Sequence, residues 1–274
     1  MKKDCNGIYI DENMQLEDSV FADQVQDDLF DIEDQSWWFR LRAKLIQSVA
    51  EHFLKRERLT MDIGGGNGYT TKVLQNAGFK TGVLEPSYEA CLNAKRRDVK
   101  YVLCSSVGER KEAWAQCMLL DVLEHTEDDV AFLKMVNREL KPGGRMILTV
   151  PAMQMLWSSE DDEAGHYRRY SKKMLCEVLK KAGFKVCYCS YFFSWLVLPV
   201  LIIRVGFEKI GLLKTTQERT YEEKLEIGNQ QFKQKSCIVN SVLSALNKLE
   251  IKAIQAKRSI PLGSSLICIA IKVF

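Results

Sequence analysis

The residues best suited to chemistry begin with a glycine-rich stretch. Asp62, Gly64, Gly66 and Gly68 follow a short apolar run in the spacing Asp-x-Gly-x-Gly-x-Gly, and a helix-like run over 69–77 comes directly after them. Where a strand ends in glycines, backbone can approach a ligand that any Cβ would push away, and the following helix presents unpaired N–H groups. The pattern predicts a cofactor-binding loop; the alternative is a glycine-rich turn without a ligand.

The spacing of the glycines limits which cofactor this loop can hold. A dinucleotide-binding fingerprint needs glycine or alanine at the position of Tyr69, where the helix packs closely on the strand, and tyrosine is too large for that contact. A phosphate-binding P-loop needs Gly-Lys-Ser or Gly-Lys-Thr, and neither follows here. The stretch therefore matches neither of these two motifs, and its own spacing is Asp-x-Gly-x-Gly-x-Gly.

A second acid ends the next predicted strand, 80–86. Glu85 comes about twenty residues after Gly64, the interval at which a carboxylate can accept hydrogen bonds from both hydroxyls of an adenosine ribose. The alternative is a solvated charge at a strand end. We interpret Glu85 as a ribose-binding residue.

A histidine motif is the candidate for handling a second substrate. His166, Tyr167 and Arg169 belong to the run Gly-His-Tyr-Arg-Arg-Tyr, which follows a predicted strand and several carboxylates. A histidine in this setting can deprotonate a hydroxyl, and the arginines can hold an anionic acceptor. The alternative is that His166 and Arg169 only fix their loop through ion pairs with 161–163. His125 is interpreted as structural.

Alternating elements position these residues. Apolar runs and helical periodicity alternate along the chain, which predicts an α/β fold with a doubly wound, mostly parallel sheet of about seven strands. A helix over 37–56 opens with Trp37 and Trp38, and one of these tryptophans can form a wall beside a ligand while Arg40 or Arg42 reaches a carboxylate. The predicted strands include 100–104, 116–121, 145–150, 184–193 and a final strand ending at 273; the other predicted helices are 88–97, 130–140 and 172–182.

Four ordered motifs resemble one enzyme family. They are the glycine stretch after Asp62, the acid Glu85, the run Asp121-Val-Leu-Glu-His125, and Leu140-Lys-Pro-Gly-Gly144 before a strand. Over residues 37–193 and the C-terminus the chain resembles class I S-adenosylmethionine-dependent methyltransferases. It is most similar to bacterial members with an aromatic-Arg segment and a His-x-Arg-Arg-Tyr motif.

The resemblance implies a Rossmann-like methyltransferase fold and S-adenosyl-L-methionine as cofactor. It implies O-methylation of a small-molecule, sugar or lipid-linked acceptor, with no nucleic-acid partner, and it assigns His166, Tyr167 and Arg169 to the acceptor. The alternative function is a non-catalytic S-adenosylmethionine-binding protein that docks to a membrane or another subunit. The implied cofactor-binding residues are Asp62, Gly64, Gly66, Gly68, Glu85, Ser105 (in place of a usual aspartate near the adenine), Asp121 and Leu123.

Three segments divide the chain. Residues 1–36 are an acidic lead-in, 37–194 and 261–274 form the methyltransferase domain, and 195–260 are a helical insertion before the last strand. The insertion contains an apolar run, 195–203, that is short and interrupted by proline, and an amphipathic helix over 235–258 with lysines on its polar side. A lid, a homodimer interface and a membrane-surface element all remain open.

The composition indicates a soluble globular protein. Hydrophobic residues make up 46% of the chain, charged residues 27%, and the net charge of +3 is too small to indicate nucleic-acid binding. Nine cysteines contain no Cys-x-x-Cys pair or metal-ligand spacing, and no secretory leader is visible, so we expect reduced thiols, no metal, and a cytoplasmic location that includes the inner membrane face.

Overall fold

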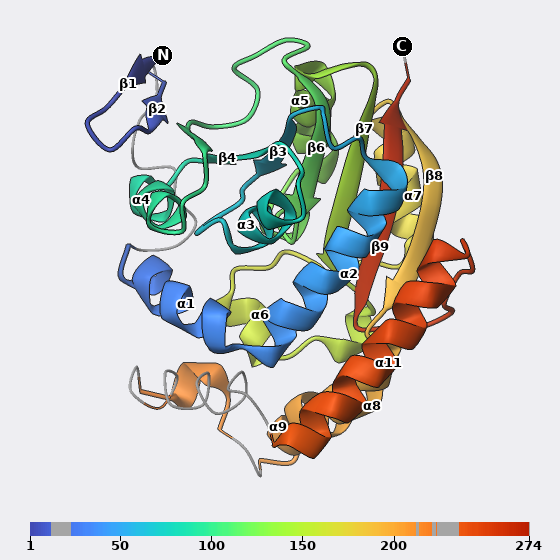
Figure 1. Cartoon of the computed structure of the whole chain (residues 1–274). Helices are drawn as coiled ribbons and strands as arrows, with labels where there is room; N and C mark the ends of the chain where they lie inside the picture. The colour runs from blue at the N-terminus through green and yellow to red at the C-terminus, as the bar shows by residue number, and fades with distance from the viewer. Residues whose placement is uncertain (12–22, 212–213, 221–222, 224–235, 274) are drawn as a thin grey trace.

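In the computed structural model, one mostly parallel sheet carries helices on both faces (Figure 1). The structure describes residues 1–11, 23–211, 214–220, 223 and 236–273. Within these residues the sheet has nine strands in the order β1-β2-β5-β4-β3-β6-β7-β9-β8. The strands are β1 (Lys2–Lys3), β2 (Tyr9–Ile10), β3 (Thr60–Ile63), β4 (Thr81–Glu85), β5 (Tyr101–Cys104), β6 (Trp114–Leu120), β7 (Leu140–Pro151), β8 (Phe184–Phe192) and β9 (Ser265–Lys272).

The central strands are the apolar runs predicted from the sequence. Strands β3 and β4 are buried along their whole length, and β3 pairs in parallel with β4 and β6. Parallel strands covered on both faces need apolar side chains at nearly every position, which explains the continuous runs. Strand β9 runs antiparallel between β7 and β8.

Two layers of helices cover this sheet, as a doubly wound fold requires. Helices α2 (Trp37–Phe53), α3 (Tyr69–Asn76) and α4 (Tyr88–Arg96) lie in front of it in Figure 1, and α5 (Asp129–Glu139) and α7 (Lys172–Lys181) lie behind. Helix α2 buries an apolar face that contains Leu41, Leu45, Ile46 and Val49. Its N-terminus is capped by Ser36, whose hydroxyl accepts from the N–H groups of residues 38 and 39.

Two sequence expectations are corrected by the fold. The sheet has nine strands and not seven, because β1 and β2 extend its edge and β2 pairs with β5. The lead-in, residues 1–36, contains these strands and helix α1 (Asp23–Gln35). Strand β7 begins at Leu140 and not at Arg145. Trp114 of β6 pairs with Leu140, and a register shift between Trp114 and Gln116 accommodates the Pro-Gly-Gly segment before Arg145.

The insertion is helical where the structure describes it. Its long helix, α11, spans Cys237–Gln255 and packs along α2, with Asn247 Nδ2 donating to the carbonyl of Leu41 at 3.0 Å. Residue 235, part of the predicted helix, lies outside the described residues. The shorter elements of the insertion are η3 (Ser194–Leu196), α8 (Val197–Pro199), η4 (Val200–Gly206), α9 (Phe207–Lys209) and η5 (Thr216–Glu218).

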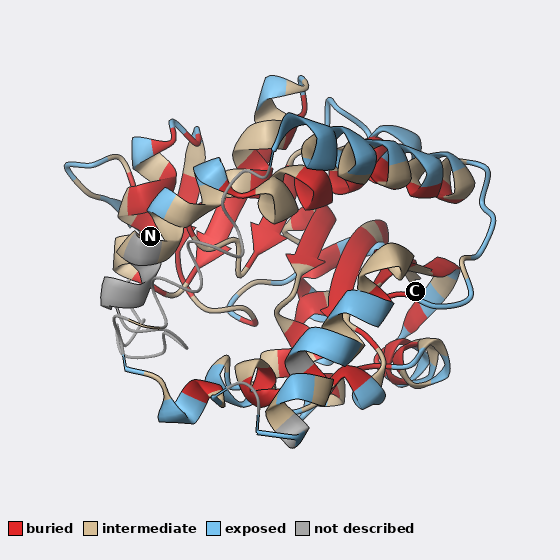
Figure 2. Ribbon diagram, turned by 90° about the horizontal axis from the view of Figure 1, so that it is seen from below, coloured by how far each residue is buried: buried red, intermediate tan, exposed pale blue. Residues whose placement is uncertain are grey.

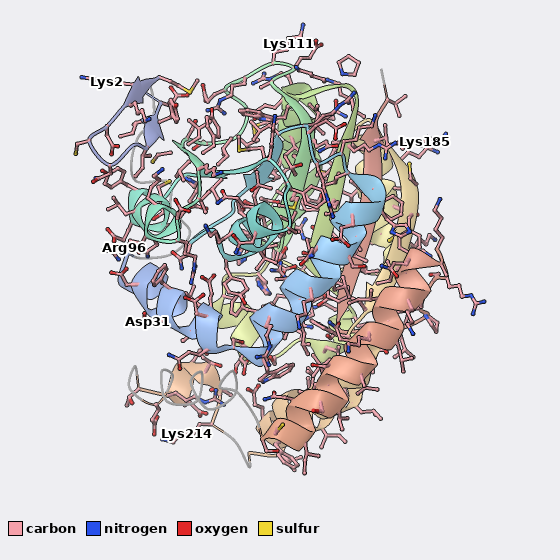
Figure 3. The ribbon with its side chains drawn as sticks, in the orientation of Figure 1. Lys2, Asp31, Arg96, Lys111, Lys185 and Lys214 are labelled. Carbon is pink, nitrogen blue, oxygen red and sulfur yellow. The ribbon has the colours of Figure 1, made fainter. Side chains whose placement is uncertain are left out.

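Burial and charge follow this layering. Figure 2 shows the strands as buried ribbon in the centre and exposed residues on the outer faces of the helices. The labelled cations Lys2, Arg96, Lys111, Lys185 and Lys214 lie on widely separated sides of the molecule in Figure 3. Within the described part of the chain, none of the helices combines the length and the apolar character needed to cross a bilayer.

Candidate functional site

A cavity of about 510 Å³ lies at the carboxyl ends of the parallel strands, where ligands bind in such sheets. Helix α1, which lies below the sheet in Figure 1, forms one wall, and the N-terminal part of α2 forms another. The lining residues are Leu29, Glu33, Trp38, Phe39, Arg42, Asp62–Asn67, Tyr69, Thr70, Leu84–Pro86, Ser106, Val107, Leu120–Val122, His125, Thr126, Phe132 and Met135.

The glycine loop joins β3 to α3 along the cavity. Gly64 and Gly66 have φ values of +67° and +51°, which L side chains rarely adopt. A Cβ on Gly64 would come within 2.7 Å of Val122, whereas a Cβ on Gly66 would meet nothing within 4 Å. Gly64 thus allows close packing, and Gly66 leaves bare backbone at the cavity. Gly68 caps α3 outside the lining.

Asp62 combines a structural contact with an oxygen that lacks a partner. Its Oδ2 accepts a hydrogen bond from Thr71 Oγ1 at 2.6 Å, which ties β3 to α3. Its Oδ1 is buried and has no hydrogen-bond partner among the described residues. Burial raises the pKa of the Asp62 carboxyl to about 6, against the lowering effect of Thr71 and of the Arg42 charge. This oxygen can accept a hydrogen bond from a cationic group in the cavity.

Glu85 ends β4 beside the glycine loop. Its two carboxylate oxygens accept backbone N–H groups, from Gly66 and from Ser87, each at 3.0 Å. The side chain is buried, and burial raises its pKa to about 6 even though both hydrogen bonds lower it. Each oxygen keeps a second lone pair, so the carboxylate can still accept ligand hydroxyls.

Arg42 and Asp121 join α2 to the end of β6. The guanidinium of Arg42 lies 2.8 Å from Asp121 Oδ2, and Thr149 Oγ1 donates to Asp121 Oδ1 at 2.9 Å. Asp121 holds a left-handed backbone with φ of +56°, which is uncommon for aspartate and frequent at functional sites. Arg42 also lies over the ring of Trp38, 5.3 Å from its centroid, and both residues line the cavity. Arg42 of the aromatic segment therefore does reach a carboxylate, and this carboxylate belongs to Asp121 of the protein itself.

Two histidines meet where the cavity borders the loop after β7. His125 ends the short helix η1 (Leu123–His125) and lines the cavity. Its ring packs edge-on against His166, with centroids 4.8 Å apart. Burial, together with the charge of His166, lowers the pKa of His125 to about 4, so this imidazole is neutral near pH 7. Burial and the Asp121 charge raise the pKa of Glu124 well above its ordinary value.

Asp161 anchors the histidine motif. It lies on α6 (Ser159–Glu163), and its Oδ1 is 2.8 Å from both His166 Nδ1 and Arg169 Nε. Against the effect of burial, hydrogen bonds from these two side chains lower the pKa of Asp161. Arg169 is buried, and its guanidinium donates hydrogen bonds to this carboxylate and to the carbonyl of Ala152. It is therefore part of the loop's own structure.

Several predicted site residues lie outside the cavity lining, among them His166, Arg169 and Gly68. Ser105 is fully buried and hydrogen-bonds to Arg110, while its neighbour Ser106 lines the cavity. Leu123 belongs to the hydrophobic core and Val122 lines the cavity beside it. Tyr167 is 54% exposed, with its ring near Arg168.

The sequence reasoning missed the wall formed by α1. Glu33 pairs with Arg97, whose guanidinium also lies 4.1 Å from the ring centroid of Phe30 and donates to the carbonyl of Asn67 at 3.0 Å. Burial raises the pKa of Glu33 to about 7. The available signal for this contact was the acidic residues of the α1 sequence together with two consecutive arginines, Arg96 and Arg97, at the end of α4.

Comparisons with known proteins bear on the family and the fold of the chain. A family model described as a methyltransferase domain matches residues 34–188. A search of curated proteins finds no match to the chain.

Solved structures share the fold over most of the chain. A Haloferax volcanii protein solved with the Trm112 methyltransferase activator has 14% identity and a TM-score of 0.56, over 92% of this chain and 95% of that chain. The cyclase SpnF has 14% identity and a TM-score of 0.58, over 95% and 96% of the two chains. Phosphoethanolamine N-methyltransferase 2 of Haemonchus contortus, solved with S-adenosyl-L-methionine, has 17% identity and a TM-score of 0.51, over 84% of this chain and 52% of that one. At such identities the likeness shows the fold alone.

Proposed function

The chain belongs to the class I S-adenosylmethionine-dependent methyltransferases, and we propose that it methylates a hydroxyl oxygen of a small-molecule, sugar or lipid-linked acceptor. The cofactor supplies an electrophilic methyl group on a sulfonium. The protein must therefore align the acceptor oxygen with that carbon and remove the hydroxyl proton. The acceptor oxygen forms a new O–C bond to the methyl group, the C–S bond breaks, and its electron pair stays on sulfur.

The cavity has features that suit this cofactor. Gly66 leaves bare backbone at its wall, Glu85 has lone pairs for the ribose hydroxyls, and Asp62 Oδ1 can accept from the cationic amino group of the methionine part. Gly64 keeps the loop packed on Val122. Asp121 lines the same cavity directly after β6. Among the residues near the third strand, we assign the adenine contact to Ser106 and not to Ser105, because Ser106 lines the cavity.

The imidazole pair at the cavity edge is the observation that carries the acceptor proposal. His125 lines the cavity, and His166 lies directly behind it, oriented by Asp161. Hydroxyl methylation needs a polar group that handles the proton or the oxygen of the acceptor, and nitrogen lone pairs suit this role. Tyr167 and Arg169 then act by holding the loop of His166 in place.

A test measures methyl transfer and cofactor binding on the same proteins. Purified protein with S-adenosylmethionine carrying a labelled methyl group is offered glycans, small hydroxylated metabolites and lipid-linked sugars. We expect transfer to a hydroxyl, with His166→Asn slowing it roughly 10²- to 10⁴-fold at unchanged cofactor affinity. His52→Asn, the same substitution at an exposed histidine of α2 outside the cavity lining, is the matched control. Methylation of RNA or protein alone would disprove the proposal.

An exposed apolar surface supports a lipid-linked acceptor. The buried stripe of α11 contains Asn247, Glu250 and Ile254, so part of its apolar face points outward. Ile238 is 78% exposed and Leu249 is 63% exposed, and exposed lysines at 248 and 252 flank them. Apolar side chains beside lysines suit the interface of an anionic membrane. We propose that this face of α11, with Leu198 and Ile202 of the insertion, rests on such a membrane.

Vesicle flotation tests this surface. We expect the protein to float with anionic phosphatidylglycerol vesicles and much less with neutral phosphatidylcholine vesicles, because the lysines favour negative headgroups. Leu249→Glu should abolish flotation, whereas Val273→Glu, at an exposed apolar residue after β9, should not. Equal flotation of both variants, or no flotation of the unaltered protein, would rule out the membrane contact.

A further inference from the structure

Three side chains with metal-ligating atoms converge at the edge of the cavity. Glu124 and His125 come from η1, after β6, and His166 comes from the loop after α6. One carboxylate oxygen and one nitrogen from each ring lie within 4.8 Å of one another. Residues about forty positions apart in the chain are thus gathered by the fold, and the glycine-loop motifs do not involve them.

Glu124 has an environment that calls for a cation. Its side chain is 1% exposed, and its Oε2 is buried with no hydrogen-bond partner among the described residues. The nearby carboxylates of Asp121 and Asp161 are paired with Arg42 and Arg169, whereas no ion pair of Glu124 occurs in the described part of the chain. A buried carboxylate without a partner is costly, and a bound metal ion is one way to offset that cost.

The imidazoles are held as metal ligands commonly are. His166 Nδ1 lies 2.8 Å from Asp161 Oδ1, and because a carboxylate only accepts, Nδ1 carries the proton and Nε2 keeps its lone pair. A carboxylate behind a histidine fixes its tautomer and makes it a better ligand. His125 hydrogen-bonds the backbone at Ala164 and Gly165, which orients its ring beside that of His166.

We propose that Glu124, His125 and His166 bind a divalent transition-metal ion such as Zn²⁺. Two imidazoles and one carboxylate with open positions are a familiar ligand set for such ions. Ligand bonds of roughly 2.0–2.2 Å require the three atoms to draw together by about 1 Å on binding. Because His125 lines the cavity, an open position faces it and can hold the acceptor's hydroxyl oxygen; this last role rests on the proposed function, and metal binding does not.

Titration with Co²⁺ tests the site directly. Chelator-treated full-length protein is titrated with Co²⁺ and followed by calorimetry and visible absorption. We expect about one equivalent to bind without the intense near-ultraviolet band of a cobalt–thiolate bond, which separates this site from the free cysteines. Glu124→Gln and His166→Asn should each weaken binding at least tenfold. His52→Asn, on the exposed side of α2, should bind as the unaltered protein does.

The outcomes separate this site from the proposed function. Circular dichroism checks that each variant is folded, and if one is not, the other decides. Absence of Co²⁺ binding, thiolate absorption, or unaltered affinity in the folded variants would overturn the metal site, even where hydroxyl methylation is observed. Site-specific Co²⁺ binding with no methylated hydroxyl would leave the metal site standing and remove the proposed function.

Discussion

Glu85 shows how a single residue can be both an anchor of the loop and a ligand-binding group. Two backbone N–H groups already bind its carboxylate, and burial still raises its pKa to about 6. Because the pKa of Glu85 is raised in the folded protein, its titration lowers the stability of the fold as the pH rises from the ordinary pKa, about 4.5, through about 6. A ligand that donates hydroxyls to the ionised form offsets this loss.

The affinity for S-adenosylmethionine should therefore depend on pH near 6. Below the pKa of Glu85 in the ligand-free protein, the carboxyl must release its proton before it can accept hydrogen bonds from both ribose hydroxyls. Binding should therefore be roughly tenfold weaker at pH 5 than at pH 7. Calorimetry across this range measures the effect. Glu85→Gln should bind weakly at every pH and show a flatter profile, and an unaltered profile in that variant would contradict the assignment of Glu85.

At the scale of elements, Glu250 of α11 fixes the start of the insertion. Its carboxylate accepts from the N–H of Phe193 at 2.7 Å, the N–H of Ser194 at 2.8 Å and the hydroxyl of Ser194 at 2.5 Å. Phe193 has a left-handed backbone with φ of +55°, an unfavourable conformation for phenylalanine. The turn after β8 thus depends on a residue that lies more than fifty positions later.

Glu250→Ala should destabilise the fold more than an ordinary surface change. It leaves buried donors without a partner, each at about 1–3 kcal/mol, so we expect a total loss of roughly 3 kcal/mol and a Tm lower by roughly 6–12 °C. Thermal unfolding followed by circular dichroism gives both values. Glu57→Ala, in an exposed turn, should change stability by no more than about 0.5 kcal/mol. Equal melting of the two variants would show that the turn does not need Glu250.

At the scale of the whole molecule, the cavity draws its walls from several elements. Helix α1, helix α2, the glycine loop and the end of η1 all contribute, and Arg42 and Arg97 join these parts by ion pairs. A ligand in the cavity contacts elements that must separate on unfolding. Its binding free energy should therefore appear in the stability of the whole chain.

S-adenosylmethionine should raise the Tm of the full-length protein. At a concentration of about 100 times its Kd it adds about 2.7 kcal/mol, or roughly 5–10 °C for a chain of this size. NAD should give no shift, because Tyr69 stands where a dinucleotide fold needs a small residue. A shift with NAD, or none with either S-adenosylmethionine or its demethylated product, would contradict the cofactor assignment.

The parts of the fold that were predicted correctly depend on short-range patterns. The loop from Asp62 to Gly68, the strand ending at Glu85 and the helix beginning at Trp37 each carry their signal within a few residues. The edge hairpin was missed because two-residue strands have no periodicity. The place of α1 beside the cavity was missed because its partner, Arg97, lies on a distant segment of the chain.

The sequence by itself determined the order of strands and helices, the glycine loop and the carboxylate one strand away, because local spacing sets backbone conformation and side-chain period. Only the tertiary structure decided which of two neighbouring residues borders the cavity, Ser106 and not Ser105, or Val122 and not Leu123. It also decided that η1 and the loop of His166 meet. These contacts arise from the packing of segments distant in the chain, and no local pattern encodes that packing.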